Sequence, residues 1–145
     1  MKFMLMMNAP RGDGDWNVMR WPAGDFAAHV KFMKQFGAEL QSAGQLVGAE
    51  GLASPAQARL VRAGNGGVPE VTDGPFAEAK EFLAGYWIVD VEGPEQAYAI
   101  AARASAAPGP RGVPLNMPIE VRQVMSGPPE TGEICPGTRD RSPAA

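Results

Sequence analysis

The chain has 145 residues, 45% of them hydrophobic, which suits one domain with a single core. Sixteen acidic side chains outnumber thirteen basic ones, and no basic stripe is present that could displace counterions from phosphates, so nucleic-acid binding is not expected. Cys135 is the only cysteine, which favours a reducing compartment, and the apolar run at residues 2–7 is too short for a signal peptide or a membrane span. We therefore expect a cytoplasmic protein that does not contact membranes.

The first predicted elements are a strand and a long helix. Residues 2–8 are almost wholly apolar, which indicates a central strand with both faces covered. From Asp25, a candidate N-cap, hydrophobic residues recur at helical spacing to residue 43, and Gly44 is placed to end the helix. Because Gly37 lies on the apolar stripe, we expect this helix to approach the sheet closely.

Five further strands and a second helix follow. The strands are predicted at residues 45–52, 58–63, 68–72, 84–91 and 119–125. Asn65 and Gly66 are typical of a tight turn, so the second and third of these strands should form a hairpin. Pro94 opens a helix that runs to about Ser105, with its inner side formed by Ala97, Ile100, Ala101 and Ala104. The domain is expected to span residues 1–126, and residues 127–145 are rich in proline, glycine and charge and predict a mobile tail.

This order of elements predicts an α+β fold, a ferredoxin-like βαββαβ sandwich with an extra hairpin. Two helices can cover only one face of such a sheet. The other face would carry Met4 and Met6 from the first strand, and Tyr86 and Ile88 from a later one. A soluble monomer does not normally expose an apolar sheet face, so we expect a homodimer formed through it.

The densest run of special-purpose residues is Thr72-Asp73-Gly74-Pro75-Phe76. Glycine and proline together predict that a strand ends here and a helical turn begins. Asp73 could cap that turn or serve as a carboxylate in a cleft, and the pattern leaves both open.

This run resembles the signature of the DGPF proteins, a branch of the YCII-related family. Further matches occur in order along the chain, at residues 2–7, 39–40, 43–44, 48–52, 58–62, 73–81, 85–87 and 119–124. The resemblance implies a dimeric α+β barrel in which two sheets meet face to face and leave a cleft beside each sheet. It also implies a histidine on the first helix that works with an aspartate. At the position that matches this histidine the chain has Met33, and His29 lies one turn earlier.

Three titratable residues are candidates for catalysis: His29, Glu50 and Asp73. One histidine and one cysteine are too few for a typical zinc site, and no glycine-rich phosphate loop is present, so neither a metal nor another cofactor is expected. A partly buried imidazole can titrate near neutrality, and a carboxylate can act as the second acid or base. The alternatives are a structural histidine at a helix–sheet boundary and a solvated carboxylate on a strand.

Five other side chains are expected to surround a small-molecule ligand. They are Trp16, Trp21, Met33, Phe76 and Tyr86. The two tryptophans could cover the cleft or only pack against the helix. We therefore expect a cofactor-independent enzyme of the isomerase, cyclase or lyase type that transfers protons in an apolar cleft. The alternative, from the resemblance, is a ligand-binding or regulatory module associated with an extracytoplasmic-function sigma factor.

Overall fold

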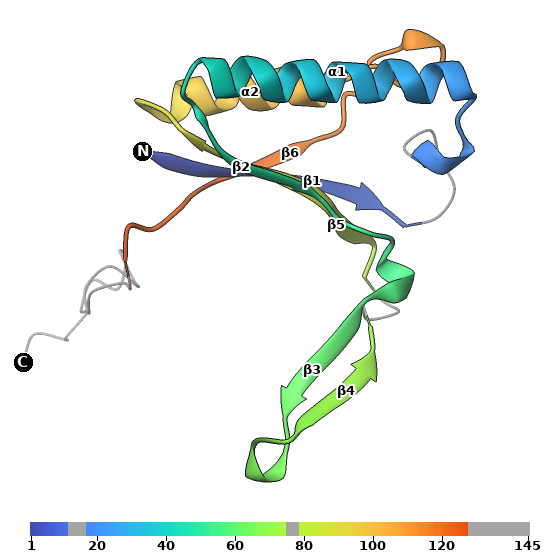
Figure 1. Ribbon diagram of the computed structural model, residues 1–145, viewed down its shortest axis with the longest axis vertical. Helices are drawn as coiled ribbons and strands as arrows, with labels where there is room; N and C mark the ends of the chain where they lie inside the picture. The colour runs from blue at the N-terminus through green and yellow to red at the C-terminus, as the bar shows by residue number, and fades with distance from the viewer. Residues whose placement is uncertain (12–16, 75–78, 128–145) are drawn as a thin grey trace, which may run out of the picture.

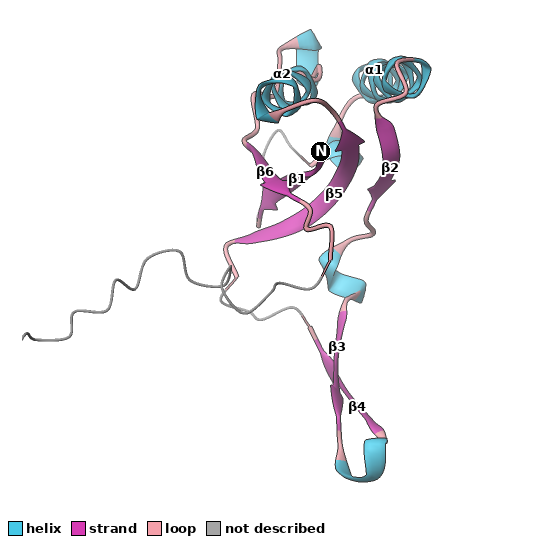
Figure 2. Ribbon diagram, turned by 90° about the vertical axis from the view of Figure 1, so that its left-hand side faces the viewer, coloured by secondary structure: helices cyan, strands magenta, loops and turns pink. Residues whose placement is uncertain are grey.

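A four-stranded antiparallel sheet with two helices on one face forms the body of the protein (Figures 1 and 2). The computed structural model describes residues 1–11, 17–74 and 79–127. In spatial order the sheet contains β2 (Leu46–Gly51), β5 (Glu81–Asp90), β1 (Lys2–Pro10) and β6 (Ile119–Gln123). The helices are α1 (Ala23–Ser42) and α2 (Pro94–Ser105). The predicted α+β class is confirmed, and the strand order is consistent with the ferredoxin-like sandwich.

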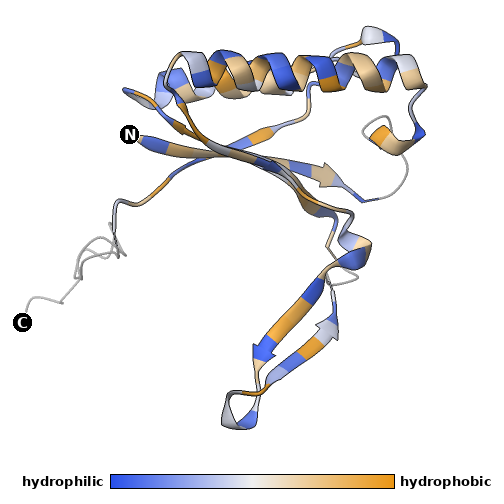
Figure 3. Ribbon diagram, viewed as in Figure 1, coloured by the Kyte–Doolittle hydropathy of each residue, from blue (hydrophilic) through white to orange (hydrophobic). Residues whose placement is uncertain are grey.

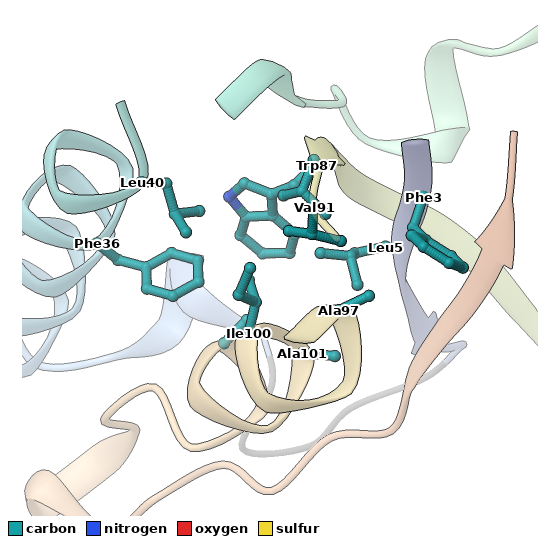
Figure 4. Close-up of a cluster of buried hydrophobic side chains, with 11 residues drawn as sticks. Phe3, Leu5, Phe36, Leu40, Trp87, Val91, Ala97, Ile100 and Ala101 are labelled. Carbon is teal, nitrogen blue, oxygen red and sulfur yellow. The ribbon is translucent and has the colours of Figure 1, made fainter. Parts of the chain in front are cut away.

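The core lies between the sheet and the two helices. The alternation predicted for the central strands is confirmed, because Phe3, Leu5 and Val89 are buried on the helix side while Met4 and Ile88 remain partly exposed on the other. The four residues expected on the inner side of α2 are buried in this core: Ala97, Ile100, Ala101 and Ala104. Figure 4 shows Ala97, Ile100 and Ala101 together with Phe36 and Trp87, whose rings meet edge to face with centroids 5.9 Å apart.

Helix α1 differs in two respects from the prediction. It begins two residues before Asp25, and Asp25 does not cap it: Pro22 is the N-cap, and the Asp25 carboxylate instead accepts a hydrogen bond from the backbone N–H of Arg111 at 3.1 Å. The predicted end is confirmed, since Gly44 has the positive φ of 69° that glycine adopts without strain. Only Phe36 and Leu40 of α1 are buried, so the helix is anchored by its C-terminal half.

The prediction for Gly37 was wrong. A Cβ added at this glycine would have no heavy atom within 4 Å, so α1 does not come close to the sheet there. The space in front of Gly37 is part of a cavity, which is described below.

The predicted hairpin is present as β3 (Arg59–Ala63) and β4 (Pro69–Asp73), joined through Asn65–Gly67. We call it the arm. It extends from the sheet on the side opposite the helices in both views (Figures 1 and 2), and all ten of its strand residues are exposed.

Some predicted features lie outside the described residues. They are Trp16, Phe76, the helical turn expected after Gly74, and residues 128–145 of the tail.

Candidate functional site

A cavity of about 1030 Å³ lies between the segment of α1 that runs from Phe26 to Gly37 and the ends of β2 and β5. Hydrophobic side chains form most of its wall, among them Phe26, Val30 and Met33 from α1. Its volume is at the upper end of the range typical for small-molecule sites, and an apolar wall with a few polar groups is typical of them.

Backbone irregularity and small residues explain why the cavity is not filled. Gly37 on α1 and Ala84 and Gly85 on β5 offer little side chain at positions that line it. The pairing of β1 with β5 also shifts register here, because Met7 pairs with Gly85 whereas Asn8 pairs with Leu83. Such bulges are common beside active sites, since they re-aim the neighbouring side chains.

His29 lines the cavity and has a defined tautomer. Its Nδ1 lies 3.0 Å from the carbonyl oxygen of Pro108. A carbonyl can only accept a hydrogen bond, so Nδ1 carries the proton and donates it to Pro108. In the neutral imidazole, Nε2 is then the nitrogen that can accept a proton. The ring of Trp21 meets the imidazole edge to face with the centroids 5.2 Å apart, which further restricts its orientation.

The loop that carries the Pro108 carbonyl is itself held in place. An isolated bridge pairs Pro108 with Pro114, and the N–H of Gly109 donates to the carbonyl of Val113 at 2.7 Å. The bond from Arg111 to Asp25 ties the same loop to the first turn of α1. His29 is thus oriented by two connections between α1 and the loop that follows α2.

Met33 and Glu50 line the same cavity as His29. His29 and the position matched to the family histidine therefore share one cavity, one helical turn apart. Glu50 is exposed on the edge strand β2 and pairs in register with Tyr86, which also contributes to the wall. The register places Glu50 and Tyr86 on the sheet face opposite the helices, whereas His29 and Met33 reach the cavity from α1.

Asp73 is not brought together with His29 in this chain. It ends β4 at the base of the arm, its side chain is 94% exposed, and its carboxylate lies 3.3 Å from Nε of Arg59 across the hairpin. It does not line the cavity within the described part of the chain. The partner of His29 is a backbone carbonyl rather than a carboxylate.

Sequence reasoning missed several residues of the site, among them Pro108, Lys34 and Arg11. Pro108 is 79 positions from His29, and no local pattern connects them. Lys34 and Arg11 also line the cavity and add positive charge to its wall. Lys34 follows Met33 on α1, so its place near the apolar stripe could have been found from helical spacing.

The comparisons with known proteins identify a family. Among the described residues, no helix is long and apolar enough to cross a membrane, and no three His, Cys, Asp or Glu side chains gather as metal ligands would. A comparison with curated proteins finds no match. The family model for the YCII-related domain matches residues 1–113, which include both helices and five of the six strands. The chain therefore belongs to the YCII-related family.

Proposed function

We propose that this protein is a cofactor-independent enzyme that moves a proton on a small molecule, in a reaction of the isomerase, cyclase or lyase type. The substrate is a small carbonyl-bearing or cyclic compound, and the site is the cavity under α1. The lone cysteine fits a cytoplasmic location for this enzyme.

The hydrogen bond from His29 to Pro108 is the observation that carries the proposal. It fixes the tautomer that leaves Nε2 as the basic nitrogen, in a wall that is otherwise mostly apolar. A positioned imidazole is the group most often used for proton transfer. Glu50 is the next acid or base, because it borders the same cavity.

The catalytic unit is proposed to be a homodimer formed through the sheet face opposite the helices. Met4, Met6, Tyr86 and Ile88 lie on this face and are each partly exposed. A second copy would remove these side chains from water, and burial of apolar surface is the main driving force for such association.

Proton abstraction can be measured without knowing the product. The assay is deuterium incorporation from D2O at the carbon next to the carbonyl, followed by NMR, in a panel of small ketones, lactones and keto acids. His29→Asn keeps an N–H near the position of Nδ1 and removes Nε2. The variant should exchange at least about 10²-fold more slowly than wild type, with an unchanged melting temperature.

Two results would contradict the proposal. An unchanged rate in His29→Asn would leave this residue a structural histidine that holds the loop after α2. Binding of panel compounds without any exchange in the wild type would favour the alternative, a ligand-binding or regulatory module associated with a sigma factor.

A further inference from the structure

The arm is a two-stranded ribbon without a core of its own. An isolated hairpin is marginally stable in water at best, so its exposure over both strands requires an explanation. Hydrophobic residues interrupt the charged ones along both strands (Figure 3). The register sorts them onto two faces of different character.

One face of the arm is apolar beyond its base. Val61 pairs with Val71, and Ala63 pairs with Pro69, so these four side chains lie on the same side of the ribbon. Val61 is 65% exposed and Val71 58% exposed. Two adjacent, exposed valines on a ribbon are typical of a surface that another element covers.

The opposite face carries the charged side chains Arg62 and Glu70 and the polar Thr72, together with Leu60. Arg62 pairs in register with Glu70, and Thr72 pairs with Leu60. At the base of the ribbon, on the same face as Val61 and Val71, Arg59 and Asp73 form an ion pair at 3.3 Å. The two arginines and two carboxylates give the arm no net charge, which argues against nucleic acid or a highly charged protein as its partner.

The position of the arm indicates which surface covers it. It extends beyond the sheet face that carries Met4, Met6, Tyr86 and Ile88 (Figures 1 and 2). Two sheets packed face to face lie about 10 Å apart, whereas a strand of five residues is about 17 Å long. If a second copy packs on this face, the arm is therefore long enough to pass along the partner's sheet.

We propose that the arm grips a second copy of this chain, with the Val61 and Val71 face turned onto the partner and the Arg62 and Glu70 face turned to water. Both surfaces that need cover lie on the same side of the molecule, so a single symmetric association buries them together. The inference rests on the homodimer of the proposed function and adds a second contact region to it.

The test compares the same substitution on the two faces. Val71→Lys and Thr72→Lys introduce one lysine each at neighbouring exposed positions of β4, and only the first is on the gripping face. Sedimentation equilibrium should show a dimer for wild type, a dissociation constant raised roughly tenfold or more for Val71→Lys, and a change within about twofold for Thr72→Lys. Equal effects of the two lysines, or no effect of either, would overturn the arm contact.

Met6→Lys separates this inference from the dimer on which it rests. A dimer that Met6→Lys dissociates and Val71→Lys leaves intact refutes the arm contact alone. A wild-type chain that is monomeric at micromolar concentration refutes the sheet-face dimer and the arm contact together. The proposed proton transfer is tested separately by the comparison of His29→Asn with wild type, and circular dichroism melts confirm that each lysine variant is folded.

Discussion

Replacing Gly37 by alanine should stabilise the protein. Alanine favours the helical conformation more than glycine does, and the added methyl group displaces no neighbouring atom. The residue lies in the interior of α1, where glycine is about 0.5–1 kcal/mol less favourable than alanine. The added methyl group would have no heavy atom within 4 Å. The free energy of unfolding should therefore rise by roughly 0.5–1 kcal/mol. For a chain of this size, each kcal/mol raises the melting temperature by about 2–4 °C, so the expected rise is roughly 1–4 °C.

Urea denaturation of wild type and Gly37→Ala measures this difference directly. Gly24→Ala is the matched control, since Gly24 is on the same helix and a Cβ there also has no heavy atom within 4 Å, but it does not line the cavity. The free energy of unfolding should rise less in Gly24→Ala than in Gly37→Ala, because Gly24 lies in the first turn of α1, where few backbone hydrogen bonds depend on the residue. A loss of stability in Gly37→Ala would mean that α1 packs closely on the sheet and that the cavity does not exist in solution.

Two further predictions concern the sheet and the tail. Gly85→Ala should lower the free energy of unfolding by roughly 1–3 kcal/mol. The new Cβ would lie 2.9 Å from the backbone carbonyl oxygen of Glu50, which cannot move unless β2 moves with it. An unchanged free energy of unfolding in the same denaturation assay would show that β2 is held loosely. Removal of residues 127–145 should leave the melting temperature nearly unchanged, and a fall of many degrees would show instead that the tail packs.

The sequence alone determined the elements of the fold, because their signals are local. Pro94 and the alanine spacing after it predicted α2 with the bounds that the structure has, and alternation in residues 2–8 assigned Phe3 and Leu5 to the buried face. Asn65 and Gly66 predicted the hairpin. Helical and strand periods act over a few residues, so a single sequence contains the information.

The candidate site was predicted only in part. The sequence selected His29, Met33, Glu50 and Tyr86, and the structure places them around one cavity. It could not predict that Gly37 faces open space, since the same glycine is expected whether a helix approaches a sheet or stands back from it.

Tertiary structure alone decided how His29 is oriented and where Asp73 lies. The imidazole is bound by a carbonyl 79 residues away, in a loop whose place depends on how α2 packs on the sheet. Asp73 ends a strand that pairs with β3, so its carboxylate meets Arg59 across the hairpin and does not line the cavity. Both outcomes depend on contacts between distant segments, and local propensity does not encode such contacts.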